Sequence, residues 1–231
     1  MNVVITGASK GLGKAFAQQF AAGNTLLLCA RNEDALLKTV NELKENFSSC
    51  NVHYKITDMS QKPAVLAFAA WCNSFGSVDI LINNAGNFIQ GSVYNEDDGV
   101  LEKMIETNLY SAYYLTKALL PEMISRKSGH IFNVCSIASL QAYSNGGSYS
   151  ISKFALLGFS KNLREELKPF NIKVTSVMPG AVFTDSWSGS GIDEERIMQA
   201  DDIAKMLKAA STLSLQACVE EIIVRPQLGD L

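Results

Sequence analysis

Apolar and polar positions along the chain form two alternating patterns, short β-branched runs and longer stretches with helical spacing. The short runs predict about seven strands, at Asn2–Thr6, Thr25–Ala30, Val52–Ile56, Asp79–Asn83, His130–Cys135, Ile172–Met178 and Glu221–Val224. The stretches between them predict helices at Lys14–Ala22, Glu33–Phe47, Pro63–Phe75, about Asp97–Ser125, Ser150–Lys168 and Asp201–Thr212. Strands and helices therefore follow one another through the whole chain.

Two of the strands are apolar on successive residues, Leu26-Leu27-Leu28-Cys29 and Ile80-Leu81-Ile82. Such runs indicate burial on both faces, which is typical of a parallel sheet covered by helices on both sides. We therefore expect an α/β fold, a doubly wound parallel sheet of the Rossmann type. No repeat or linker appears, so residues 1–231 are expected to form one domain, with a short substrate lid around 185–199.

Composition excludes several classes of function. The net charge is −3 and no basic run appears, so neither nucleic acid nor an anionic membrane is an expected partner. No stretch approaches the ~18 apolar residues that a membrane span needs. The five cysteines are odd in number and scattered, and with two histidines they give no metal-ligand spacing. This pattern suits a reducing compartment, and we expect a cytoplasmic protein without a metal.

A glycine-rich turn joins the first predicted strand to the first predicted helix, Thr6-Gly7-Ala8-Ser9-Lys10-Gly11-Leu12-Gly13. Gly7 permits a tight turn, Gly11 a close approach of backbone to a pyrophosphate, and Gly13 close packing of the helix on the sheet. Free N–H groups at the start of that helix would face the phosphates. The spacing differs from the commoner Gly-x-Gly-x-x-Gly, but its place after the first strand indicates a dinucleotide site.

The residue after the second strand bears on which dinucleotide is bound. A site of this kind normally carries an acid there, which binds the ribose 2′-hydroxyl. Here the strand ends at Ala30 and Arg31 follows, while Lys10 adds a second positive charge. A guanidinium suits a 2′-phosphate, so these residues favour NADP over NAD. The alternative is that both are ordinary surface cations, near the opposing charges of Glu33 and Asp34.

Four polar residues in the middle of the chain suggest proton transfer to a carbonyl oxygen. Tyr149 and Lys153 are four residues apart on a predicted helix, so both project from one face. A nearby ammonium favours the phenolate and lowers a tyrosine pKa from ~10. Ser136, at the end of the fifth strand, can donate a hydrogen bond to the same oxygen, and Asn108 precedes it. A Tyr-x-x-x-Lys pair alone is also common on surfaces, but the ordered set favours catalysis.

These segments resemble the short-chain dehydrogenase/reductase family over essentially the whole chain. The matching segments are the glycine turn, Asn83-Asn84-Ala85-Gly86, Thr107-Asn108, Cys135-Ser136, Tyr149-Ser150-Ile151-Ser152-Lys153 and Pro179-Gly180-Ala181-Val182-Phe183-Thr184. The resemblance implies an NADP(H)-dependent oxidoreductase that interconverts a small carbonyl compound and its alcohol by hydride transfer.

The resemblance also implies the role of each site residue. Tyr149 would be the general acid/base, Lys153 would lower its pKa and bind the nicotinamide ribose, and Ser136 would orient the carbonyl. Asn108 would bend its helix and hold a water that relays protons to Lys153. Besides Tyr149 and Lys153, the implied cofactor-binding residues are Gly7, Ser9, Lys10, Gly11, Leu12, Gly13, Arg31, Asp58, Asn84, Ala85, Gly86, Pro179, Gly180, Val182 and Thr184.

Within that set the resemblance assigns three places. Asp58 would contact the adenine, Asn84 and Gly86 would line the adenine-ribose side, and Val182 with Thr184 would hold the carboxamide. Asp58 equally suits the start of a helix, and Asn84 equally suits a structural tie between strands.

Substrate contacts are expected from Leu140, Tyr143 and Trp187, although Trp187 equally suits packing of the lid. The chain resembles bacterial sepiapterin-reductase-like members, which implies a small dicarbonyl or a pterin side chain as substrate. One alternative is a 3-oxoacyl-thioester reductase of fatty-acid synthesis. Another is a non-catalytic NADP-sensing regulatory protein, for which a broken catalytic set would be expected.

Self-association is expected through the helices around 97–125 and 150–168. Their apolar side chains exceed what two helices need to cover one face of a sheet, and include Tyr110, Tyr113, Tyr114, Phe154, Leu157 and Phe159. By family resemblance we expect a homodimer or a homotetramer.

Overall fold

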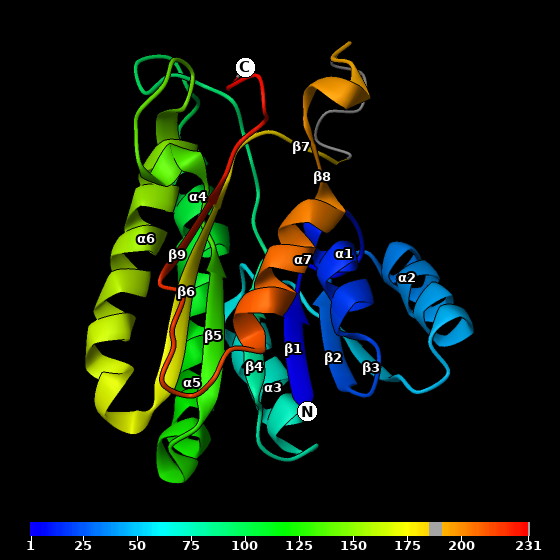
Figure 1. Cartoon of the computed structure of the whole chain (residues 1–231). Coiled ribbons are helices and arrows are strands. Elements are labelled where there is room, and N and C mark those ends of the chain that lie inside the picture. The colour runs from blue at the N-terminus through cyan, green and yellow to red at the C-terminus, as the bar shows by residue number, and fades with distance from the viewer. Residues whose placement is uncertain (185–190, 231) are drawn as a thin grey trace.

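The computed structural model of the chain describes residues 1–184 and 191–230. Within these residues seven parallel strands form one sheet, in the order β3-β2-β1-β4-β5-β6-β9 (Figure 1). The strands are β1 (Asn2–Thr6), β2 (Thr25–Ala30), β3 (Asn51–Ile56), β4 (Ile80–Asn83), β5 (Gly129–Val134), β6 (Ile172–Pro179) and β9 (Glu221–Val224). This arrangement confirms the predicted doubly wound parallel sheet.

Helices cover both faces of the sheet. They are α1 (Gly11–Phe20), α2 (Glu33–Asn46), α3 (Lys62–Asn73), α4 (Val100–Ile105), α5 (Ser111–Arg126), α6 (Gly147–Leu167) and α7 (Ala200–Ser211). One buried cluster joins the sheet to α1, α2 and α7, and a second joins its other face to α3, α5 and α6. In β2, Leu26 and Leu28 belong to the first cluster and Leu27 and Cys29 to the second. The continuous apolar run is thus buried on both faces, as its sequence predicts.

Helices α1 and α6 each begin earlier than the sequence pattern predicts. Helix α1 begins at Gly11 rather than Lys14, and α6 begins at Gly147 rather than Ser150. Both glycines have positive φ, 53° and 35°, a conformation that glycine adopts without strain. The earlier start of α6 places Tyr149 within its first turn.

The expected long helix around residues 97–125 is interrupted. Helix α4 ends at Ile105, a π-helical turn spans Glu106–Tyr110, and α5 follows from Ser111. Asn108 lies inside this wider turn, which is the irregularity expected at that position.

A second small sheet was not predicted, because its strands are too short to show a period. It pairs β7 (Val182–Phe183) with β8 (Met198–Gln199). The expected lid at 185–199 lies partly outside the described residues, and Trp187 lies outside them entirely. Of the lid region the structure describes a short helical turn, Glu194–Arg196, which precedes β8.

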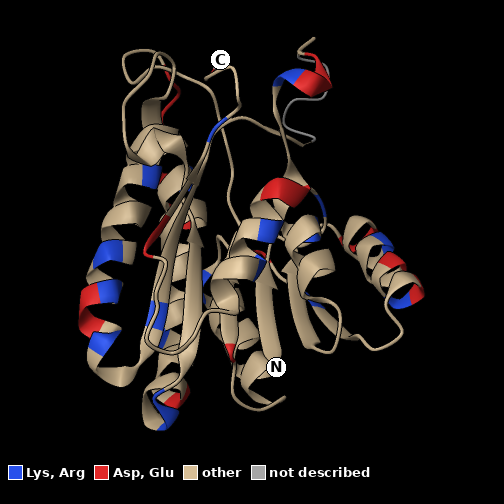
Figure 2. Ribbon diagram, viewed as in Figure 1, with Lys and Arg blue, Asp and Glu red and all other residues tan. Residues whose placement is uncertain are grey.

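Charges of both signs are interspersed along the outer helices α2 and α6 (Figure 2).

Over residues 1–184 and 191–230, no helix is both long and apolar enough to cross a membrane. In the same residues no group of three or more His, Cys, Asp or Glu side chains could hold a metal ion.

Candidate active site

A pocket of about 510 Å³ lies where the carboxyl ends of β1 to β5 meet. The chain leaves β1 toward β2 and β3 on one side and returns to β4 on the other, so the strand order reverses beside β1. Ligands of open parallel sheets bind at such a point. The pocket is lined by Gly7, Ser9–Gly13, Ala30–Asn32, Thr57–Met59, Asn84–Phe88, Thr107, Val134, Cys135, Tyr149, Lys153 and Thr184.

The glycine turn forms the floor of this pocket. At Gly13 a side chain cannot fit, because its first carbon would stand 2.1 Å from the carbonyl oxygen of Gly7. At Gly11 the first carbon would stand 3.2 Å from the Thr184 methyl group. Helix α1 therefore begins close against the sheet, and its first N–H groups face the pocket. Such a helix start is suited to bind phosphate.

Asn84 fastens the end of β4 to the glycine turn. Its side-chain nitrogen donates to the carbonyl oxygens of Thr6 (2.9 Å) and Gly7 (3.2 Å). The Thr6 hydroxyl in turn accepts the N–H groups of Asn84 (3.0 Å) and Ala85 (2.8 Å). Asn84 thus has the structural function that the sequence left open, and it also lines the pocket.

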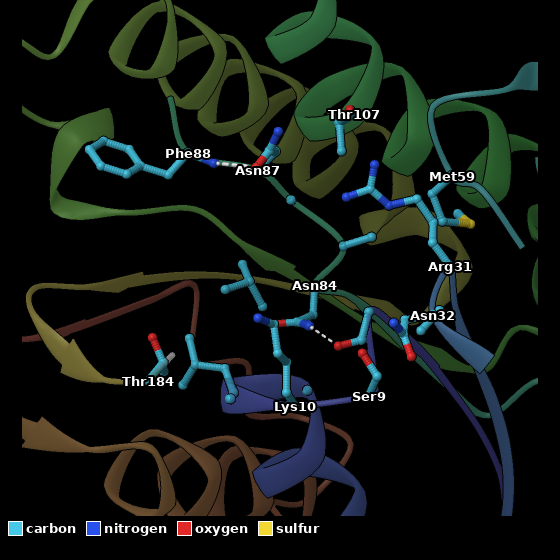
Figure 3. A pocket seen from close by; sticks show the side chains of 18 of the residues that line it. Ser9, Lys10, Arg31, Asn32, Met59, Asn84, Asn87, Phe88, Thr107 and Thr184 are labelled. Carbon is cyan, nitrogen blue, oxygen red and sulfur yellow. Dashed lines mark hydrogen bonds between the residues drawn. The ribbon is translucent and has the colours of Figure 1, made fainter. Parts of the chain in front are cut away.

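One end of the pocket is cationic. Figure 3 shows Arg31, Asn32 and Met59 together at that end, far from Phe88. The Asn32 side chain is engaged elsewhere, since it accepts the N–H of Ala35 (2.8 Å) and caps α2. Asp58 also lines the pocket, and its carboxylate accepts the N–H (3.0 Å) and hydroxyl (2.8 Å) of Ser60. Asp58 therefore stabilises the turn that precedes α3 and does not cap the helix itself, whose N-cap residue is Gln61.

At the other end three polar side chains converge. The Lys153 ammonium lies 5.8 Å from the centre of the Tyr149 ring and donates to the Val134 carbonyl oxygen (2.8 Å). Ser136 is buried, and its oxygen accepts the N–H of Ala138 (3.1 Å). That bond leaves the Ser136 proton available for donation, and Ser136 lies close enough to Tyr149 to act on its pKa.

Burial dominates the proton affinities at this end. It lowers the pKa of Lys153 to about 8, because an ammonium loses hydration there. It raises the pKa of Tyr149, and the hydrogen bond with Ser136 acts in the opposite direction. The expected lowering of the Tyr149 pKa by Lys153 stays a prediction: burial has the largest effect on Tyr149, and the Lys153 ammonium is directed at Val134.

Asn108 lies behind these residues and is buried. Its side-chain nitrogen donates to the Asn87 carbonyl oxygen (3.0 Å) and the Ser152 hydroxyl (2.9 Å), and its oxygen accepts the Asn87 N–H (2.7 Å). Gly86 is next to it: a side chain there would start 3.3 Å from the Asn108 oxygen and 3.6 Å from the Lys153 nitrogen. Gly86 thus lies at the catalytic end, not on the adenine-ribose side as expected.

Seven of the expected residues that the structure describes do not line the pocket, and two of them, Ser136 and Asn108, lie directly behind its catalytic end as described above. Pro179 ends β6, Gly180 bonds to Val224, and Val182 is buried against the α1 face of the sheet. Leu140 is exposed after the helical turn Ile137–Ser139. Tyr143 lines a neighbouring pocket of about 700 Å³, between residues 92–94 and the start of α6.

Other lining residues were missed by the sequence analysis. They are Ala30, Asn32, Thr57, Met59, Asn87, Phe88, Thr107, Val134 and Cys135. Most follow the end of a parallel strand, which is a positional signal that the sequence offered. Cys135 is buried and its pKa is raised to about 12, in line with a packed thiol rather than a nucleophile.

The fold and this pocket define an α/β protein of the dinucleotide-binding class. A sequence profile described as short chain dehydrogenase matches residues 1–195. The chain belongs to this family, as the resemblance of its motifs implied.

Comparison with individual proteins agrees with that membership. A sepiapterin reductase of Chlorobaculum tepidum is 32% identical over 241 residues, covering 99% of this chain and 97% of the relative. The bovine dehydrogenase/reductase SDR family member 7B is 38% identical over 193 residues. That match covers 79% of this chain, which spans only 58% of the bovine relative's length. The crystal structure of L-sorbose reductase from Gluconobacter frateurii, complexed with NADPH and L-sorbose, superposes with a TM-score of 0.90, at 28% identity and 97% and 95% coverage.

Proposed function

We propose that the protein is an NADPH-dependent reductase that interconverts a small ketone or other carbonyl compound and its alcohol. One observation carries the proposal. The Tyr149 phenol, the Ser136 hydroxyl and the Lys153 ammonium meet at one end of a pocket whose other end carries Arg31. The first group suits proton transfer to a carbonyl oxygen, and the second suits a 2′-phosphate.

The residues present fit a dinucleotide phosphate. The cradle has no room for a side chain at Gly13, and the positive φ of Gly11 would strain one there, while the start of α1 supplies N–H groups for the pyrophosphate. Ser9 and Lys10 would hold the phosphates, and Arg31 the 2′-phosphate. Thr184 lies against Gly11 and would contact the nicotinamide half. When bound, the nicotinamide supplies a hydride to the carbonyl carbon.

The chain's own residues supply the proton and hold the oxygen. The Tyr149 hydroxyl gives its proton to the carbonyl oxygen as that oxygen gains negative charge. Ser136 stabilises the same oxygen, because its acceptor side is occupied by Ala138 and its proton is free to be donated. Lys153 uses one ammonium proton on Val134 and has two others for the ribose and the phenolate.

Asn108 lies behind Tyr149, Ser136 and Lys153 and is hydrogen bonded to the segments around them. It binds Ser152, whose hydroxyl donates to the Tyr149 carbonyl oxygen (2.7 Å), and it binds Asn87 through two further bonds. The π-helical turn therefore fixes both the start of α6 and the loop after β4. We propose that Asn108 positions Tyr149 and Lys153.

The sepiapterin reductase likeness supports a small dicarbonyl or a pterin side chain as substrate. A 3-oxoacyl thioester is the alternative carbonyl substrate, and no feature of the described residues favours it. A non-catalytic sensor would not need Ser136 and Lys153 gathered beside Tyr149. We further propose a cytoplasmic homodimer or homotetramer, on the free thiols and the exposed apolar residues of α5 and α6.

The test is a direct assay of NADPH oxidation with diacetyl, sepiapterin, acetoacetyl thioesters and aromatic ketones. Turnover of one or more carbonyl compounds, abolished in Tyr149→Phe, is expected. A folded protein that binds NADPH and reduces none of them would contradict the proposal.

A further inference from the structure

The loop between β4 and α4, residues 84–99, is fastened near one end to the π-helical turn that holds Asn108 and near the other end to the catalytic helix α6. Near β4, Asn87 makes two backbone hydrogen bonds with the Asn108 side chain. Near α4, the Glu96 carboxylate accepts bonds from the hydroxyl and the N–H of Ser148. Between these points the Gly91 N–H donates to the Asn145 carbonyl oxygen (3.3 Å). The loop is therefore a fixed wall of the site.

The fit between this loop and the start of α6 is close. At Gly147 a side chain would start 2.4 Å from the Gly91 carbonyl oxygen and 2.9 Å from the Glu96 carboxylate. The Ser92 hydroxyl also donates to the Asn145 side chain (2.8 Å). Small displacements of the loop would therefore move the first turn of α6, which carries Tyr149.

Phe88 lies on this wall at the reacting end of the pocket. Its ring stands edge-on to the Tyr149 ring, with centroids 4.8 Å apart and planes at 86°. The Phe88 N–H donates to the Asn87 side chain (3.0 Å), which fixes the backbone that carries the ring. Figure 3 shows this bond, with Phe88 at the end of the pocket opposite Arg31.

Although it packs on Tyr149, Phe88 remains 47% exposed. A half-exposed aromatic ring beside a proton donor presents apolar surface at the place where the substituents of a reacting carbonyl must lie. Covering that surface with a flat apolar group is favourable. Covering it with hydroxyl-bearing carbons leaves those hydroxyls without the hydrogen bonds that water provides.

We infer that Phe88 determines substrate specificity, by holding a flat or aromatic substituent of the carbonyl compound against Tyr149. The site accordingly prefers aryl ketones and aryl dicarbonyls over small aliphatic and polyhydroxylated ones. The inference deepens the proposed function and rests on it.

The test compares two dicarbonyl compounds that differ in one substituent, 1-phenyl-1,2-propanedione and diacetyl. The parent enzyme should show the higher kcat/KM with the phenyl compound. Phe88→Ala should lower kcat/KM for that compound by about tenfold, chiefly through KM, and change the value for diacetyl by less than about threefold. In Phe88→Leu the ratio of kcat/KM for the phenyl compound to kcat/KM for diacetyl should lie between those of the parent and Phe88→Ala. Binding of NADPH should be unchanged in both variants.

Tyr94→Ala is the matched control, since it removes an aromatic ring that is 88% exposed on the same loop but does not line the site pocket. The ratio of its kcat/KM values for the phenyl compound and diacetyl should equal that of the parent. If kcat/KM of folded Phe88→Ala falls by the same factor for both substrates, or falls for neither, the inference is overturned and the reductase assignment stands. If Phe88→Ala does not fold, Phe88→Leu decides by the same ratio. A parent enzyme that reduces neither compound nor any other carbonyl would overturn the proposed function, and the inference with it.

Discussion

The Glu96 carboxylate binds Ser148, the residue directly before Tyr149, across 52 positions of sequence. It accepts both the hydroxyl and the backbone N–H at the start of α6. A helix start has N–H groups without partners inside the helix, and its dipole favours a negative charge there. Glu96 therefore stabilises the first turn of the helix that carries Tyr149 and Lys153.

Glu96→Gln should weaken this contact, because an amide can accept one of the two bonds but meets the other with a donor. We expect a loss of about 1 kcal/mol in the free energy of unfolding, and a lower kcat with NADPH affinity unchanged. Urea denaturation and steady-state kinetics measure both. Asp98→Asn, an exposed carboxylate of the same loop, is the control for the change in charge. Equal effects of the two substitutions would show that Glu96 acts only through net charge.

Tyr149→Phe should leave the fold and NADPH binding intact, because only one hydroxyl group is lost. The reduction rate should fall by ~10²–10⁴, the usual contribution of a general acid. Tyr94→Phe removes a hydroxyl from an exposed tyrosine outside the pocket and should keep the parent rate. Parent turnover in a folded, NADPH-binding Tyr149→Phe enzyme would place the proton donor elsewhere.

NADPH should bind at least tenfold tighter than NADH, a difference of about 1.4 kcal/mol. Arg31→Ala should weaken NADPH and leave NADH nearly unchanged, because the guanidinium is assigned to the 2′-phosphate alone. Fluorescence titration with both cofactors measures this. Lys38→Ala, an exposed cation farther along α2, should change neither affinity. A preference for NADH in the parent would reverse the cofactor assignment.

Stability should fall in acid because of His130. Its ring bonds to the Thr175 hydroxyl (2.8 Å), and burial lowers its pKa from 6.5 to about 3. Between those two pH values the unfolded chain takes up the proton and the folded chain does not. The free energy of unfolding should therefore decrease as pH falls through this window, by up to about 1.4 kcal/mol per pH unit.

Urea titrations from pH 7 to pH 4 test this dependence. The neutral variant His130→Gln should show a smaller decrease than the parent. His53→Gln, at the half-buried histidine of β3, is the matched control. A parent and a His130→Gln variant with the same pH dependence would show that His130 does not control acid stability.

The proposed self-association places apolar residues of α5 and α6 in a subunit interface. Tyr113 and Phe154 are 40% and 44% exposed, whereas Leu157 is buried in the chain's own core and is not part of that surface. Light scattering should give a particle of at least twice 25.1 kDa. Phe154→Lys should shift it toward the monomer, and Leu66→Lys, at an exposed leucine of α3, should not. A monomeric parent would rule the assembly out.

The strands were the most predictable part of the molecule. The bounds of β1, β2 and β9 agree with the sequence pattern, because their apolar runs lie between clear turn residues. The start of α6 was less predictable, because Gly146 and Gly147 suggest a turn and the acceptor for Ser148 comes from Glu96, far away in sequence. Local pattern cannot show a helix cap supplied by a distant loop.

The residues of the site also differ in how well the sequence predicts them. The glycine turn and the Tyr149–Lys153 spacing are local and could be identified from sequence. The position of Phe88 against Tyr149 depends on how the loop after β4 crosses α6, which no periodicity encodes. The same is true of Gly86, whose neighbours Asn108 and Lys153 come from separate elements.

The central place of β1 in the sheet governs the order in which the protein can fold. β1 pairs with β2, which follows it closely in sequence, but its other edge waits for β4, which lies 77 residues beyond it from Val3 to Ile80. Pairing across such a separation is slow, because a long loop must close first. Until then the free edge of β1 is open to other chains, and intermediates of this kind aggregate. The phosphate cradle, built on that edge through Thr6 and Asn84, forms only once the two halves of the sheet have joined.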